Sequence, residues 1–410
     1  MTIQDISSLQ IAIGDSDYQE LDRGNLSVSI ADSIYNLSPV VKVSLTDSYG
    51  LYLGSRIGNY GTPWKLKLTA YGIPIEYPLK AESFEITSSS ETGKGLGGSY
   101  SATLLHEFMF QSSEVKAYKN KSASSLISSL FSDYTFNGSE YDYSSSSNLD
   151  MDFIYNPGYT PVEFIDKILL PLSSPTTDNI NNPYYIFIDA QNRLKYISLN
   201  TMLQRGAVNT LEISNLESFS SDDGKKKYSP RKNALVAISA PFSQMYSKIF
   251  NTIDTVTCRV ENGEYSTVDS SLKKIAGSKM PFYDRKRSLV KYMSDKDFQT
   301  TDEMMRLQAG INYKNRKSYM LDKIVVTTLL NLDLCAGTMV NLNSYFSNLG
   351  ETVAKAYTGK YLIESSVHKW DSGYNTGVSQ LVLATPTPSV ESRPPWKGMY
   401  IQESKQYGYF

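Results

Sequence analysis

Residues Tyr319 to Pro386 carry the pattern that decides the fold. The segment opens with an apolar, β-branched run, MLDKIVVTTLL (320–330), and a shorter run, GTMVNL (337–342), follows a turn. Two further runs, YLIESSVHKW (361–370) and GVSQLVLAT (377–385), flank the turn-forming residues DSGYN (371–375). Pro386 and Pro388 predict the end of the sheet, because proline cannot donate a hydrogen bond to a ladder. The pattern predicts a small antiparallel barrel or sandwich without an evident reactive group, which favours a scaffold in an assembly.

Length and composition are those of an ordinary globular chain. The 410 residues are 40% hydrophobic and 20% charged, and the formal net charge of −2 gives no sign of nucleic-acid binding. Such a length suits roughly two to four domains. The two cysteines, Cys258 and Cys335, are too few and too far apart for a disulfide framework or a Cys-based metal site. The 31 tyrosines fit either β-rich surfaces or protein interfaces.

No targeting segment is expected in this sequence. The residues after Met1 lack a basic region followed by an apolar core, and no apolar run reaches the length of a membrane span. We therefore expect a chain that is made and folded in a cytoplasm and is not stably inserted in a membrane.

Strand patterns dominate the first part of the chain, and helical patterns enter from about residue 114. Alternating runs predict strands at 26–30, 40–46, 64–68, 84–87 and 100–104. Apolar residues at helical spacing predict a first helix that contains Ala123, Leu126, Ile127, Leu130 and Phe131. Thr160, Pro161 and Glu163 form the capping box of a second helix, which we expect to end at Pro171. A hairpin over 184–198, a strand at 234–239 and a third helix near 300–311 complete the reading.

An internal repeat links the two β-rich parts. The sequence GTPWKL (61–66) aligns with GTMVNL (337–342), and AESFEI (81–86) aligns with IESSVH (363–368). A glycine-containing loop and an alternating strand follow in both copies, so we interpret them as two related barrels.

These patterns predict a mainly β (α+β) chain with two similar antiparallel β-barrel domains. The first barrel spans residues 1–113, and the second takes 214–244 and 318–386. A mixed α/β middle region occupies 114–213 and about 245–317. Residues 387–410 form an extended C-terminal arm without helical periodicity. Its aromatic residues are candidates for docking onto a partner: Trp396, Tyr400, Tyr407, Tyr409 and Phe410.

Motifs that could carry chemistry are weak. Gly93 to Gly98 fits GxGxxG, but a dinucleotide site needs a helix next, and a strand pattern follows instead. The two histidines, His106 and His368, lie in strand patterns without a GxSxG elbow, and we expect His368 on a sheet surface. The Lys225–Lys232 cluster fits a solvated loop or a contact to an acidic partner. We therefore expect no catalytic residue, cofactor or metal, and no enzyme.

Several segments, taken in order, resemble the central baseplate hub of contractile-tailed bacteriophages, which is related to the hub portion of type VI secretion spike proteins. They are LSVSIADSIY (26–35), KVSLTD (42–47), PVEFI (161–165), YIFID (185–189), EMMRLQA (303–309), LCAGTMV (334–340) and YLIESSVHKW (361–370). The resemblance covers most of the chain to about residue 386 and leaves the arm without a counterpart.

The resemblance implies a structural homotrimer in the virion tail baseplate, assembled in the host cytoplasm. Two barrels per subunit would make a pseudo-six-fold ring that joins a six-fold tail tube to a three-fold central spike. Its other partners would be further baseplate proteins, with the tape measure protein and DNA passing through its channel, and no sequence-specific nucleic-acid binding is implied. Two alternatives remain open: a receptor- or glycan-binding tail protein, and a cell-wall hydrolase component with paired carboxylates in a cleft.

Overall fold

Strands make up most of the residues that the computed structural model describes, which confirms the predicted mainly β (α+β) class. The structure describes residues 6–13, 19–20, 26–47, 63–70, 73–92, 95–142, 151–173, 184–214, 219–220, 226–227, 233–239, 247–254, 260–266, 287–293, 322–345, 359–371 and 376–385. The predicted helix near 300–311 and the arm from 387 lie outside these residues.

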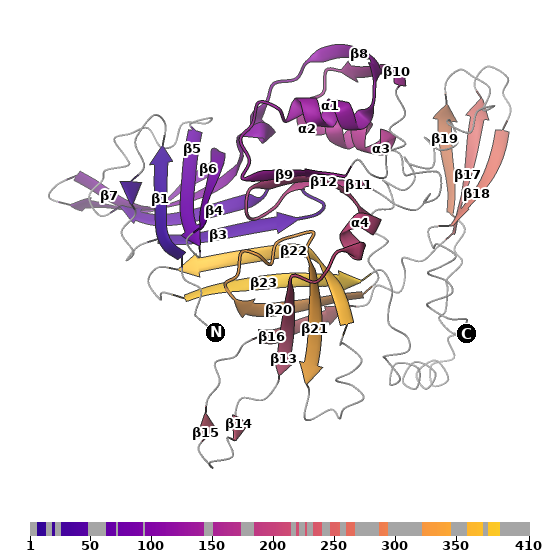
Figure 1. Ribbon diagram of the computed structural model, residues 1–410. Coiled ribbons are helices and arrows are strands. Elements are labelled where there is room, and N and C mark those ends of the chain that lie inside the picture. Colours follow the sequence, from indigo (N-terminus) through magenta and orange to yellow (C-terminus); the bar gives the residue numbers. More distant parts are fainter. Residues whose placement is uncertain are drawn as a thin grey trace.

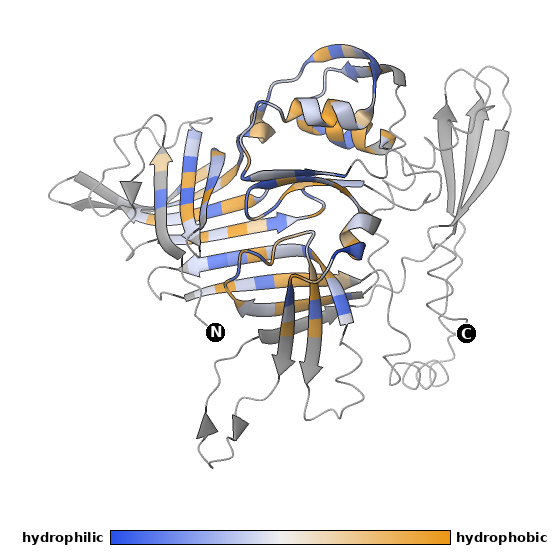
Figure 2. Ribbon diagram, in the orientation of Figure 1, coloured by the Kyte–Doolittle hydropathy of each residue, from blue (hydrophilic) through white to orange (hydrophobic). Residues whose placement is uncertain are grey.

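The first lobe is an antiparallel sheet (Figure 1) with the strand order β3-β4-β7-β6-β5-β1-β2. Its strands are β1 (Ile6–Ile13), β2 (Gln19–Glu20), β3 (Leu26–Ser33), β4 (Val40–Asp47), β5 (Pro63–Ala70), β6 (Ile73–Thr92) and β7 (Gly95–His106). In β4, Val41, Val43 and Leu45 are buried while Lys42 and Ser44 are exposed, as an alternating strand with one covered face requires. Figure 2 shows the same alternation along neighbouring strands.

The second lobe contains the strands that the sequence predicts between residues 320 and 385. Its strands are β13 (Asn209–Ser214), β16 (Asn233–Ser239), β20 (Asp322–Leu329), β21 (Met339–Tyr345), β22 (Gly359–Asp371) and β23 (Thr376–Thr385). The order is β16-β20-β23-β22, with β21 beside β22 and β13 parallel to β21. Every strand that we predicted between residues 320 and 385 is present.

The two lobes share one sheet, because β22 pairs with β3 in antiparallel fashion from Ser365 opposite Ser33 to Asp371 opposite Ser27. We call this junction the seam. The described strands do not close into a barrel in either lobe, so closure of two barrels stays a prediction.

The same strand order occurs in both lobes, as the internal repeat requires. The order β3-β4-β7-β6-β5 corresponds to β16-β20-β23-β22-β21, and all these neighbours are antiparallel. The hydrogen-bond register also agrees with the sequence alignment. One row of directly opposite residues crosses the first lobe at Ile30, Val41, Leu104 and Ala81, and its counterpart crosses the second at Ile238, Ile324, Leu383 and Ile363.

A middle region of short helices and strands lies between the lobes in the sequence. It comprises η2 (Glu107–Phe110), β8 (Val115–Lys121), α1 (Ala123–Leu130), β9 (Gly138–Tyr141), β10 (Met151–Pro157), α2 (Pro161–Phe164), the π-helical η3 (Ile165–Leu169), α3 (Leu170–Leu172), β11 (Tyr184–Ile188), β12 (Arg193–Ser198) and α4 (Leu199–Gln204). The predicted first helix is α1, and the capping box between Thr160 and Glu163 is present.

Pro171 does not end the second helix as expected, because α3 runs to Leu172. A π-helical turn precedes the proline, and the N–H of Leu170 bonds to the carbonyl of Ile165, five residues back. This turn changes the hydrogen-bond register directly before a residue that has no N–H of its own, so the helix can continue past it.

Besides the two small sheets of the middle region, β10-β8 and β11-β12-β9, the described strands form two more small sheets. One pairs β14 (Phe219–Ser220) with β15 (Lys226–Lys227), and the other has the order β18-β17-β19, formed by β18 (Val260–Ser266), β17 (Ser247–Asp254) and β19 (Arg287–Met293).

The hydrophobic cores are shared between the parts of the chain. The core of the first lobe includes Ala190 from the middle region together with Leu332, Cys335 and Trp370 from the second lobe. Another core packs the β11–β12 hairpin against second-lobe residues such as Met339 and Leu362. The seam is therefore a packed interior.

Candidate functional site

Asp32 on β3 is the polar centre of the seam. Its Oδ1 atom accepts the N–H of Ser366 at 3.2 Å and also the Ser366 hydroxyl. Its Oδ2 atom accepts the N–H groups of Ala190 at 2.7 Å and Ala336 at 3.0 Å. One buried carboxylate thus joins β3, β22, the β11–β12 turn and the loop before β21.

His368 extends this network across the sheet. Its Nε2 atom lies 2.8 Å from Ser366 Oγ, and its Nδ1 atom lies 2.7 Å from Ser379 Oγ on β23. The Ser366 hydroxyl donates to Asp32, so the network assigns the ring proton to Nε2 and leaves Nδ1 to accept from Ser379. We expected His368 on a sheet surface, and this was wrong: it is 2% exposed, because β22 is covered on this face.

The order of these groups differs from that of a hydrolase triad. In a triad the histidine lies between the acid and the nucleophilic serine, whereas here Ser366 lies between Asp32 and His368. Burial lowers the pKa of His368 to about 4. Burial, only partly offset by the hydrogen bond from Ser366, raises the pKa of Asp32 to about 6. The network therefore holds a neutral histidine inside the sheet, where its role is structural and it links β22 to β23.

A second polar cluster surrounds Asp189, at the end of β11. Its carboxylate accepts Arg193 Nε at 2.9 Å and pairs with Lys195 Nζ at 3.1 Å. Burial acts to raise the pKa of Asp189, but Lys195 and Arg193 outweigh it and the net pKa is lowered. Burial also raises the pKa of the neighbouring Cys335 thiol, whose sulfur accepts a hydrogen bond from Arg193 at 3.1 Å. Such a thiol is a poor nucleophile.

The turn over residues 189–193 makes hydrogen bonds to both lobes. The Tyr77 hydroxyl on β6 donates to the carbonyl of Ala190. On the other side, Gln191 Nε2 donates to Asp333 Oδ1 at 2.7 Å. The hairpin that we predicted from the sequence thus holds the two lobes and the middle region together.

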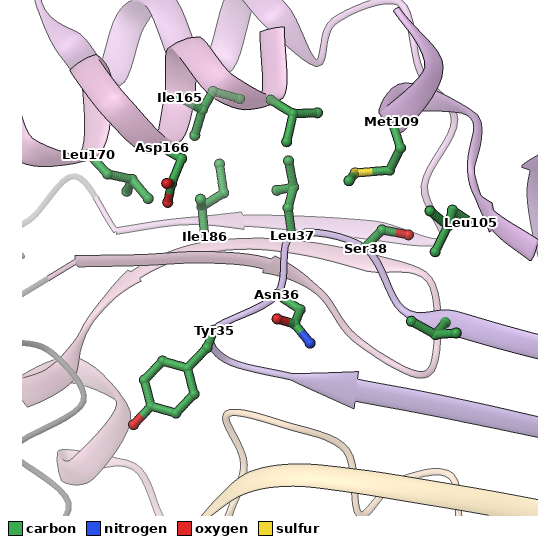
Figure 3. Close-up of a pocket in the computed structure, with 12 residues that line it drawn as sticks. Tyr35, Asn36, Leu37, Ser38, Leu105, Met109, Ile165, Asp166, Leu170 and Ile186 are labelled. Atoms are coloured by element: carbon green, nitrogen blue, oxygen red, sulfur yellow. The ribbon is translucent and has the colours of Figure 1, made fainter. Parts of the chain in front are cut away.

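A hollow of about 290 Å³ lies between the α2–α3 segment and the loop at Tyr35–Ser38. Figure 3 shows Ile165 and Leu170 of the helical segment facing Leu37 and Ile186 across it. Its carboxylate, Asp166, is solvent-exposed. The lining suits contact with an apolar group better than acid–base chemistry.

Comparison with known proteins places this architecture. No family model matches the chain, and neither does any curated protein. The 43 kDa tail protein of prophage MuSo2 from Shewanella oneidensis aligns with a TM-score of 0.55 and 11% identity, over 94% of this chain and 100% of that one. The tail protein from Neisseria meningitidis MC58 aligns with a TM-score of 0.54 and 9% identity, over 93% and 98%.

The chain has the fold of these two tail proteins. An E. coli component of the type VI secretion system also aligns, with a TM-score of 0.48 and 8% identity over 92% of this chain and 78% of that chain. The tail-protein fold spans nearly the whole length of this chain, so it includes both lobes and the middle region.

The residues singled out in the sequence fall in different places. Of the GxGxxG glycines, Gly95 and Gly98 lie in the strand β7, where Gly95 pairs with Thr92 of β6, and Gly93 lies outside the described residues. His106 ends β7, where burial lowers its pKa to about 4 and its Nδ1 atom accepts the N–H of Phe108 at 3.2 Å. Within the described ranges, no group of three His, Cys, Asp or Glu residues could hold a metal. Nor is any described helix long and apolar enough to cross a membrane.

The predicted docking residues of the arm lie outside the described residues: Trp396, Tyr400, Tyr407, Tyr409 and Phe410. Most of the Lys225–Lys232 cluster also lies outside them, apart from Lys226 and Lys227 in β15. Sequence reasoning missed Asp32 and Asp189 as anchors. The only available signal was their position at the ends of strands that were themselves predicted.

Proposed function

We propose that this protein is the central hub of a phage tail baseplate, a homotrimeric ring with pseudo-six-fold symmetry. The observation that carries the proposal is the duplicated strand set, which lies in a single sheet with one register in both lobes. Three chains with two related lobes each would present six similar units, while their other surfaces would keep three-fold symmetry.

The fold supports this reading, because both structures that share it are tail proteins, one of them from a prophage. A ring of this kind would match a six-fold tail tube on one face and a three-fold central spike on the other. Further baseplate proteins would bind around it, and its channel would pass the tape measure protein and DNA. The role is structural, and the protein resides in the virion tail.

The C-terminal arm has a separate part in the proposal. Its aromatic side chains, Trp396 and Tyr400 among them, would anchor it on a neighbouring subunit, on the spike or on another baseplate protein. Aromatic groups suit this task because they combine large apolar area with a polar edge.

The mass of the purified protein in solution tests the proposal. Light scattering should give three times the 45.9 kDa of one chain over a wide concentration range. A mass that stays at one chain at every concentration would contradict it. Binding of glycans by a monomer would favour the receptor-binding alternative, and turnover of peptidoglycan would favour the hydrolase.

A further inference from the structure

The strand β22 changes partners half-way along its length. Its first part, Gly359–Leu362, pairs with β21, and its second part, Ser365–Asp371, pairs with β3 across the seam. The other edge of β22 pairs with β23 from Leu362 to Asp371. This arrangement gives the long strand a neighbour on both edges.

Its counterpart β6 also pairs with two strands, but no described strand takes the place that β3 has beside β22. Residues 73–80 of β6 pair with β5, and residues 79–92 pair with β7. No strand among those described pairs with the other edge of β6 beyond Lys80. A long open edge of this kind exposes a row of N–H and C=O groups that readily accept another strand.

The equivalence of β6 and β22 extends to single residues. Each has a register shift against its neighbour at the same place, between Ala81 and Ser83 in β6 and between Ile363 and Ser365 in β22. Two glutamates, Glu82 and Glu364, occupy these bulges.

The equivalent residues of β6 and β22 differ in their exposure to solvent. Glu364 is 4% exposed and pairs with Lys323 at 2.6 Å. Its counterpart Glu82 is exposed, and so is Glu85, whose counterpart Val367 is half-buried beside β3. The first lobe therefore leaves open the surface that the second lobe covers with β3.

The strand equivalent to β3 in the repeat is β16. It pairs with β20, and β13 comes close to it, but no strand among those described is hydrogen-bonded to its other edge. Within this chain β16 and β6 are not paired, and they lie at opposite ends of the run β16-β20-β23-β22-β3-β4-β7-β6. A second copy of the chain, as in the ring of the proposed function, can bring an open β16 edge to the open edge of β6.

We propose that β16 of one subunit pairs antiparallel with the second half of β6 of the next and repeats the β3–β22 seam between chains. This rests on the ring of the proposed function and names the surfaces that close it. The register follows from the repeat: Val367 lies opposite Ala31 within the chain, so Glu85 lies opposite Ser239 of the next subunit. The contact is heterologous, and it closes a ring when the rotation between copies closes.

Disulfide trapping tests this register in the full-length chain with Cys258 replaced by serine. The variant Glu85→Cys/Ser239→Cys should oxidise to chains linked as dimers and trimers on a non-reducing denaturing gel. Directly opposite strand residues meet the Cα spacing that a disulfide needs. Glu85→Cys paired with Ala237→Cys, out of register, should cross-link at least about tenfold more slowly. Each single variant should run as one chain.

The intrachain seam supplies the matched control. Ala31→Cys/Val367→Cys occupies the equivalent pair and should form a disulfide within one chain, leaving its mass unchanged. If this control oxidises and the protein is a trimer by light scattering, but the Glu85/Ser239 pair stays reduced, the proposed interface is wrong while the hub survives. A protein that stays a single chain by light scattering overturns both.

Discussion

At the scale of single residues, the seam depends on buried polar groups whose hydrogen bonds are saturated. Asp32 accepts four of them, and His368 is held between two serine hydroxyls. Buried polar networks are stable when every member has a partner and costly when one is removed. The sheet therefore tolerates ionisable groups in its interior only in defined protonation states.

Acid should destabilise the fold through its histidines. The pKa of His368 is about 4 in the folded chain and 6.5 in an ordinary setting, so the unfolded chain binds a proton that the folded chain rejects. The neutral histidine therefore contributes about 3 kcal/mol to the free energy of unfolding above pH 6.5, and this contribution is lost as the pH falls to 4. Asp32, whose pKa is raised to about 6, acts in the opposite direction between pH 6 and 3.8. Burial also lowers the pKa of His106 to about 4, so His106, like His368, makes the fold less stable in acid. Together the two histidines outweigh the opposite effect of Asp32.

The variant His368→Gln checks this account, because an amide can bond to both serines but does not titrate. Its melting temperature should fall less between pH 7.5 and pH 4.5 than that of the wild type. Equal acid sensitivity in both proteins would show that His368 does not carry the effect.

Gly337 should not tolerate a side chain. Its φ is 78°, and a Cβ atom there would lie 2.5 Å from Cζ of the buried Phe187. Gly337→Ala should lower the free energy of unfolding by about 3 kcal/mol or more, from left-handed backbone strain and overpacking together. Gly206→Ala is the control, since nothing lies within 4 Å of its added Cβ. Thermal melts of both variants decide the matter, and equal melting points would refute the steric argument.

At the scale of elements, strand order and register repeat between the lobes. The alignment of residues 81–86 with 363–368, made from sequence alone, is the one that the hydrogen-bond ladders give. Alternation and turn residues encode strands locally, which is why these elements could be predicted. The helix through Pro171 could not, because the π-helical turn that accommodates it has no signature in the sequence.

The seam and its polar network could not be predicted from the sequence. Asp32 and Ser366 are 334 residues apart in the chain and meet only because β3 and β22 become neighbours. His368 stands in an alternating strand that could bury either face, and which face is covered depends on the whole sheet. Long-range pairing, unlike local periodicity, has no signal in a single sequence.

Replacing Asp32 with Asn should loosen the seam on both of its sides. Asn can accept at one oxygen only, so buried N–H groups of Ala190 or Ser366 lose their acceptor, at a cost of about 2–4 kcal/mol. Hydrogen exchange should speed up in peptides that contain Ala190, Ala336 and Ser366. Peptides of α1, which packs in a different core, serve as the internal control. Faster exchange in α1 alone would contradict the assignment.

At the scale of the whole molecule, the shared cores tie two similar lobes into one unit. The first-lobe core takes Leu332, Cys335 and Trp370 from the second lobe, so the lobes are fixed relative to each other. A rigid pair of related lobes suits a ring in which three chains present six similar units.

Deletion of residues 387–410 should affect assembly more than folding. The arm is proposed to bind a partner, whereas the described cores are built without it. The truncated chain should keep the melting temperature of the full chain within a few degrees and incorporate less into baseplates. Unchanged incorporation, measured by pull-down of co-expressed baseplate proteins, would remove the role assigned to Trp396 and its neighbours.

The most direct test of the hub is an end-on view of the purified protein by electron microscopy. We expect rings with three-fold symmetry, six similar lobes and an open centre, in which each lobe joins the next through a continuous sheet. Class averages that show single, separate chains, or a closed two-fold particle without a channel, would contradict it.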